Sequence, residues 1–214
     1  MIKQGLYLPE FERDNCGAGF ICNLKGAKSN EIIHDALEIL IKLEHRGAVS
    51  SDGKTGDGAG ILIDIPHEFF VKNTSFKLPE AREYAVGMTF LPQSDNQLNY
   101  CKKVLEDEVK KQGLEVLGWR KVPVNKAHLG YVASKIEPAI EQIFIGKNGK
   151  ELNEHQFNAK LFTARKISEH TIVNSKLSDR NKFYFPSLSA TTIIYKGLLM
   201  PEDIRNYYTD LSNP

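Results

Sequence analysis

The order of strand-like and helix-like segments constrains the fold of this chain most. Short apolar segments rich in β-branched and aromatic residues predict strands, and longer amphipathic segments predict helices. The predicted strands are residues 17–26, 60–65, 83–92, 114–124, 139–149, 182–189 and 191–199, and the predicted helices are 29–47, 96–113, 154–172 and 201–208. Some predicted strands follow one another with no helix between them, so the strict alternation of a doubly wound parallel sheet is missing. The sequence therefore predicts an α+β fold with mostly antiparallel sheets.

The size and charge of the chain limit its class and its partners. A chain of 214 residues forms one large domain or two small ones, and it can bury about 70% of the surface that its unfolded form exposes. Lysine and arginine number 28 against 27 aspartate and glutamate, which gives a net charge of +1. This balance provides no broad basic surface. We therefore expect no nucleic-acid partner and no membrane partner.

The cysteines and the first residues indicate the compartment. The sequence has three cysteines, an odd number, at Cys16, Cys22 and Cys101. None of their spacings is that of a paired metal-binding motif. The first fifteen residues, MIKQGLYLPEFERDN, carry charges throughout and lack the apolar core of a secretory signal. No segment reaches the length of a membrane span. These features predict a reducing, cytoplasmic location.

A glycine-rich segment, AVSSDGKTGDGAG at residues 48–60, raises the question of nucleotide binding. Its first eight residues resemble a phosphate-binding loop, except that Ala48 stands where the motif requires glycine. A phosphate-binding loop lies between a strand and a following helix, whose N-terminus faces the anion. Here a predicted helix precedes the segment and a predicted strand follows it. We therefore expect Lys54 and Thr55 to be ordinary residues of a helix-to-strand connection.

Cys16 stands at the boundary between a polar, aperiodic arm of fifteen residues and a predicted strand. A thiol attacks as the thiolate, and with a pKa of about 8.5 it is mostly protonated at neutral pH unless a base takes the proton. If the chain were cut before Cys16, the new α-amino group would provide that base on the same residue. The alternative is a cysteine buried in a strand. Cys101, on the apolar side of a predicted helix, is expected to be a small buried hydrophobic residue.

Four segments together resemble a known family. They are CGAGFICNLKG, ALEILIKLEHRGA, TGDGAGILIDIPHEFF and FYFPSLSATTIIYKGLL. In this order they resemble the amino-terminal domain of the glutamate synthase large subunit, which is a class II glutamine amidotransferase. The likeness extends from about Gly5 to Pro214.

The resemblance implies an N-terminal-nucleophile hydrolase fold, an αββα four-layer sandwich of which this chain would form an incomplete part. It implies that residues 1–15 are a propeptide and that residues 16–214 are the amino-terminal part of the amidotransferase domain. It further implies that the Cys16 thiolate hydrolyses the side-chain amide of L-glutamine to glutamate and ammonia. In the family the ammonia aminates 2-oxoglutarate, with FMN and an iron–sulfur cluster in the rest of the enzyme. The implied partners are the remainder of the synthase chain and a small reductase subunit.

The resemblance also assigns substrate-binding residues. Arg46 and Gly47 match the Arg-Gly pair beside the nucleophile of the family, although Arg46 alone would equally suit a structural ion pair. Asp57 is expected to shape its loop by a hydrogen bond. His45 and His67 are expected to have structural roles, because this mechanism needs no histidine.

Two parts of the family's site have no counterpart in this sequence. The family uses an Asn-Gly pair to bind the oxyanion and a later arginine to hold the substrate carboxylate. Asn148-Gly149 is the one Asn-Gly pair here, and its context predicts a hairpin turn. The chain is therefore expected to be a fragment of a longer protein. The alternative function is a non-catalytic binding module of the same fold.

Overall fold

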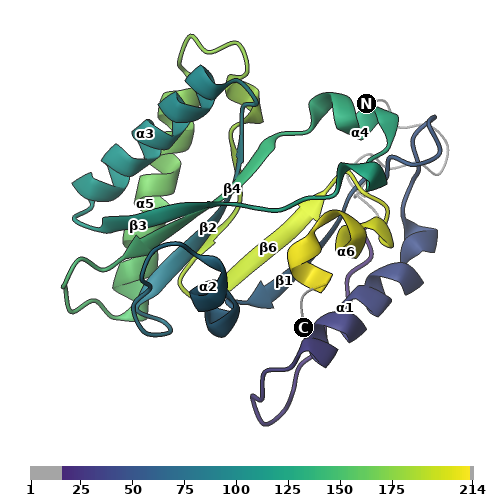
Figure 1. Cartoon of the computed structure of the whole chain (residues 1–214), viewed down its shortest axis with the longest axis horizontal. Helices are drawn as coiled ribbons and strands as arrows, with labels where there is room; N and C mark the ends of the chain where they lie inside the picture. Colours follow the sequence, from purple (N-terminus) through teal and green to yellow (C-terminus); the bar gives the residue numbers. More distant parts are fainter. Residues whose placement is uncertain (1–15, 213–214) are drawn as a thin grey trace, which may run out of the picture.

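A computed structural model describes residues 16–212, in which six helices and six strands form the fold (Figure 1). The helices are α1 (Asn30–Lys42), α2 (His67–Asn73), α3 (Asp95–Lys111), α4 (Tyr131–Ile136), α5 (Glu154–Val173) and α6 (Asp203–Tyr207). The strands are β1 (Ala59–Asp64), β2 (Tyr84–Leu91), β3 (Glu115–Lys121), β4 (Ala139–Gly146), β5 (Tyr184–Ser189) and β6 (Thr192–Gly197).

The strands form two sheets, and every pairing is antiparallel. One sheet has the order β3-β4-β2-β5, and the other pairs β1 with β6. The α+β class with antiparallel sheets is therefore confirmed.

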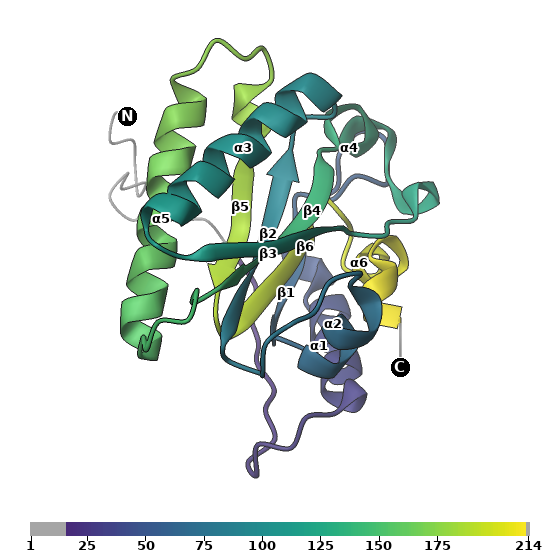
Figure 2. The ribbon, with the colours of Figure 1, turned by 60° about the vertical axis from the view of Figure 1, so that its left-hand side comes forward.

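Helices α3 and α5 cover one face of the four-stranded sheet (Figure 2). Their apolar stripes, at helical spacing, form one core with side chains of β2, β4 and β5. The largest buried members include Leu105, Phe157, Leu161, Ile143 and Phe185. Cys101 is a fully buried member of this core, as the sequence predicts.

A second core lies on the opposite face of the four-stranded sheet. It joins side chains of β2 and β4 to inward-facing residues of β1 and β6, and Leu37 of α1 packs into it. From left to right, Figure 1 shows the helices α3 and α5, the larger sheet, the smaller sheet and α1. This is the αββα layer order of the N-terminal-nucleophile hydrolase fold. Helix α1 covers the outer face of the smaller sheet only in part, since Leu62 on the outer side of β1 is 60% exposed.

A buried polar network ties the last described residues to the larger sheet. The Arg120 guanidinium of β3 donates to both carboxylate oxygens of Asp210, over 2.7 and 2.8 Å. Arg120 also donates to the Gln142 side-chain oxygen, and Gln142 and Tyr195 bond to each other. The Tyr195 hydroxyl donates to Asp210. Each buried polar group in this network therefore has a partner.

The strand predicted at residues 17–26 is wrong. The structure has no strand there, and the chain instead runs along α1, with Gly17 beside Leu43 and Gly19 beside Ile39. Phe20 is 89% exposed. An isolated strand has no stability without a neighbour that satisfies its backbone groups. Within residues 16–212 no strand pairs with this segment.

The end of α1 and the turn at Asn148-Gly149 also differ from the prediction. Helix α1 ends at Lys42, and a short 3-10 helix, Glu44–Arg46, continues to Gly47. Asn148 and Gly149 both have positive φ, as in a type I′ turn, but the chain then enters α5 and does not return as a strand. The hairpin prediction is therefore wrong. The capping box of Asn153 and Gln156 explains the difference, because it starts a helix soon after the turn.

Candidate active site

Cys16 is exposed and lies at the end of α1. A Cβ atom placed on the next residue, Gly17, would lie 3.3 Å from the Leu43 side chain. Leu43 ends α1 and is followed by the 3-10 turn that contains Arg46. The structure thus brings the Cys16 segment to the same end of α1 as the predicted Arg46-Gly47 pair.

Arg46 and Gly47 are both exposed. The Arg46 amide donates to the Leu43 carbonyl, and the Gly47 amide donates to the Glu44 carbonyl, so main-chain bonds define their turn. Among residues 16–212 no carboxylate forms an ion pair with Arg46. Within that part of the chain the structure therefore gives no support to the alternative of a structural ion pair.

The segment after Gly47 forms a small hairpin, residues 48–58, which we call the glycine hairpin. Val49 forms a β-bridge with Gly56, and the Asp57 amide donates to the Ala48 carbonyl over 3.0 Å. Strand β1 follows it, so no helix N-terminus faces the hairpin from its C-terminal side. The expected context, a helix before the segment and a strand after it, is confirmed.

Asp52, at the tip of the glycine hairpin, is a residue that the sequence analysis missed. Its carboxylate accepts hydrogen bonds from the Thr55 hydroxyl and from the amides of Lys54, Thr55 and Val132. These bonds, led by that of the Thr55 hydroxyl, hold the pKa of Asp52 well below its ordinary value. Asp57 makes no side-chain hydrogen bond to residues 16–212, so the loop-shaping role expected of it belongs to Asp52. An aspartate followed by glycine is a turn signal that could have identified it.

His45 and His67 have structural partners, as expected. His45 Nδ1 lies 3.0 Å from the Lys42 carbonyl oxygen. His67 Nδ1 lies 3.1 Å from the hydroxyl of Tyr84, and burial raises the pKa of Tyr84 to about 12. Both rings therefore hold local structure.

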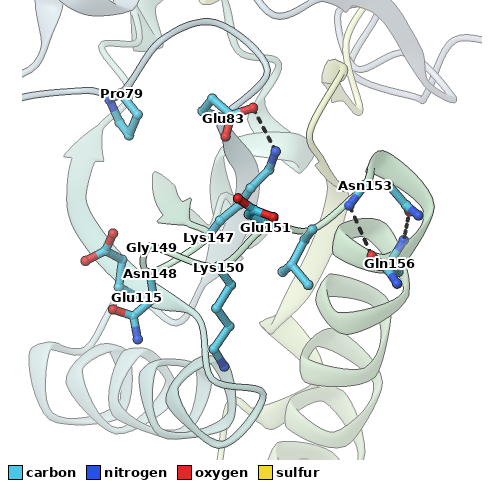
Figure 3. Close-up of a pocket in the computed structure, with 11 residues that line it drawn as sticks. Pro79, Glu83, Glu115, Lys147, Asn148, Gly149, Lys150, Glu151, Asn153 and Gln156 are labelled. Atoms are coloured by element: carbon cyan, nitrogen blue, oxygen red, sulfur yellow. Dashed lines mark hydrogen bonds and ion pairs between the residues drawn. The ribbon is translucent and has the colours of Figure 1, made fainter.

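A cavity of about 750 Å³ lies at the carboxyl end of β4, and Figure 3 shows the side chains that line it. Lys147 pairs with Glu83 over 2.8 Å, and Asn153 and Gln156 bond to each other's backbone. None of the predicted site residues lines this cavity. It is therefore separate from the Cys16 site.

The burial of the three thiols predicts a difference in their reactivity. Cys16 and Cys22 are exposed, whereas burial raises the pKa of Cys101 to about 11. We expect iodoacetamide at pH 8 to alkylate Cys16 and Cys22 in the native protein and to spare Cys101, as read by peptide mass spectrometry. Alkylation of Cys101 at the rate of Cys22 would contradict the described packing of α3.

The described residues contain neither a metal-binding cluster nor a membrane-spanning helix. Between residues 16 and 212, no three His, Cys, Asp or Glu side chains gather closely enough to hold a metal ion. No helix of that part of the chain is long and apolar enough to cross a membrane.

Comparison with known proteins identifies the family. Residues 16–214 match the family model of class II glutamine amidotransferases. The chain is 43% identical, over 98% of its length, to the glutamate synthase (NADPH) large chain of Bacillus subtilis (strain 168), and it spans 14% of that relative. It is also 43% identical to the glutamate synthase (NADH) of Saccharomyces cerevisiae, over 99% of this chain and 10% of the relative. For the ferredoxin-dependent glutamate synthase 1 of Arabidopsis thaliana the identity is 40%, over 94% of this chain and 12% of the relative. The chain belongs to the class II glutamine amidotransferases.

Proposed function

We propose that Cys16 is the nucleophile of a glutaminase site that hydrolyses the side-chain amide of L-glutamine to glutamate and ammonia. The observation that carries the proposal is the position of Cys16, which is exposed and adjoins Gly17, beside Leu43 at the helix end that leads to Arg46-Gly47. The family match that begins at residue 16 supports it, since a terminal nucleophile must be the first residue of the mature domain.

The proposed chemistry has two steps. The α-amino group of a mature Cys16 takes the thiol proton, and the thiolate attacks the amide carbon of glutamine. The C–N bond breaks, the nitrogen leaves as ammonia after receiving that proton, and a γ-glutamyl thioester remains on Cys16. Water then attacks the thioester, which releases glutamate and regenerates the thiol.

Arg46 and Gly47 are proposed to bind the substrate beside the nucleophile. Arg46 can donate in parallel to a carboxylate or to carbonyl oxygens, since no described residue occupies its guanidinium. Gly47 has no side chain, which allows a ligand to approach the main chain closely.

The relatives, which are named glutamate synthases, support a wider role. We propose that residues 1–15 are a propeptide and that the chain is the glutaminase part of a cytoplasmic glutamate synthase. The ammonia would then aminate 2-oxoglutarate in the remainder of the synthase chain, which would hold FMN and an iron–sulfur cluster and bind a small reductase subunit.

One observation favours a non-catalytic module as the second candidate. The one Asn-Gly pair of the sequence, Asn148-Gly149, lines the cavity at the carboxyl end of β4 and is not at the Cys16 site. An acyl transfer without oxyanion donors is slower by about 10²- to 10³-fold for each lost donor.

The first residue of the native protein and its release of ammonia test the proposal. We expect the protein from its own cells to begin at Cys16 and to release ammonia from L-glutamine. A form that retains residues 1–15 should be slower by about 10²-fold, because an acylated amine cannot act as the base. Full activity with Met1 retained would contradict the amine as base, and a protein that begins at Met1 and releases no ammonia would favour the non-catalytic module.

A further inference from the structure

We propose that Asp52 and Thr55 form a positioning pair, which caps helix α4 from outside and thereby fixes the turn that contains Arg46 and Gly47. This inference rests on the proposed glutaminase function. Asp52 and Thr55 act through the glycine hairpin and are not proposed to contact the substrate.

Helix α4 has no side-chain cap of its own. Its N-cap residue is Gly130, which has no side chain to accept a hydrogen bond from the first turn. The glycine hairpin supplies the missing acceptors. The Val132 amide donates to the Asp52 carboxylate over 2.9 Å, and the Ala133 amide donates to the Thr55 hydroxyl over 3.2 Å.

The pair also bonds to itself, which leaves both side chains little freedom. The Thr55 hydroxyl donates to the Asp52 carboxylate over 2.6 Å while it accepts from Ala133. The Lys54 and Thr55 amides donate to the other carboxylate oxygen of Asp52, over 3.0 and 2.7 Å. One carboxylate thus closes the hairpin tip and caps the helix at the same time.

Glycine residues allow the hairpin to approach its neighbours this closely. A Cβ atom on Gly130 would collide with the Thr55 hydroxyl oxygen, and one on Gly56 would collide with the Leu199 carbonyl oxygen. Neither position has room for a methyl group without movement of the backbone. The second arm of the hairpin is therefore held between α4 and the segment after β6.

The hairpin passes this constraint to the candidate substrate-binding turn. Its first arm begins at Ala48, directly after Gly47, and is held to the second arm by the Ala48–Asp57 and Ser50–Thr55 bonds. Besides its own main-chain bonds, the turn is held at its two ends, by α1 and by the hairpin. Release of the hairpin tip would loosen the second of these ends.

The experiment compares variants of the full protein by glutamine hydrolysis and by amide hydrogen exchange. Asp52→Asn, Thr55→Val and Gly130→Ala should each raise the KM for L-glutamine about tenfold and change kcat by less than about threefold, because they displace binding residues without removing them. The Val132 and Ala133 amides should exchange at least about tenfold faster. Thr55→Ser retains the hydroxyl and should restore wild-type values. Asp64→Asn, which removes exposed ion pairs of β1, is the matched control and should change neither readout.

Each result has a distinct meaning. Faster exchange at Val132 with an unchanged KM in Thr55→Val would overturn the positioning role, and unchanged exchange in all three variants would overturn the cap itself. If one variant exchanges rapidly throughout β2 and β4, it has unfolded, and the other two decide the question. A wild-type protein that releases no ammonia contradicts the proposed function, and amide exchange then still tests the cap.

Discussion

Replacement of Cys16 by alanine is expected to lower the rate of ammonia release from L-glutamine by about 10⁴-fold or more, because no other group can form the thioester. Cys16 is exposed at the end of α1, so its side chain contributes no core packing that alanine would remove. The free energy of unfolding should therefore stay the same while the activity is lost. A colorimetric or coupled assay of ammonia, with protein that begins at residue 16, measures the effect.

Cys22→Ala is the matched control. Cys22 is the other exposed thiol of the same segment, six residues away, and should be replaceable with an activity change below about twofold. Loss of activity in Cys22→Ala together with retained activity in Cys16→Ala would show that the nucleophile is Cys22 and not Cys16. Retained activity in both variants would exclude Cys16 and Cys22 as the nucleophile.

Asp210→Ala is expected to give the largest loss of stability, about 3–5 kcal/mol. The Arg120 and Asp210 side chains are only 10% and 4% exposed, so the variant would leave a buried guanidinium without its counter-ion. The Tyr195 hydroxyl would also lose its acceptor. Urea unfolding followed by the fluorescence of Trp119, the single tryptophan of the chain, reports the change from the residue next to Arg120.

Asp64→Ala provides the comparison for this prediction. The ion pairs of Asp64 with Lys28 and Arg82 are exposed, and their loss should cost about 0–1 kcal/mol because water screens such pairs. Equal losses for the Asp64 and Asp210 variants would show that burial does not control the strength of these pairs.

The sequence predicted well those elements whose signal lies within their own residues. The helix predicted at 154–172 is α5, Glu154–Val173, and the strand predicted at 60–65 is β1, Ala59–Asp64. The buried residues of α5 recur every three or four positions, and β1 is a short apolar run rich in β-branched residues that Pro66 follows. Helices α2 and α4 have seven and six residues, which is too short for a period to appear.

The failures concern features that depend on distant parts of the chain. The apolar residues of the segment at 17–26 resemble a strand, but a strand also requires a partner, which local sequence does not show. Asp52 and Val132 lie 80 positions apart, so no local pattern connects the hairpin to the helix that it caps. Cys16 could be proposed from the sequence, because the chemistry of a terminal thiol depends on its own amino group, and its role stays a prediction.

The two cores also differ in how much of the chain must exist before they can close. The core under α3 and α5 uses residues from Ala85 to Ala190, a continuous part of the sequence. The core between the sheets joins Leu37 to residues as late as Leu211. A chain emerging from the ribosome can therefore assemble the first core while the second still lacks β6 and α6. During that interval the inward-facing side chains of β1 are not yet buried, because β6 and α6 are missing. This is therefore the stage of synthesis at which the protein most needs protection from aggregation.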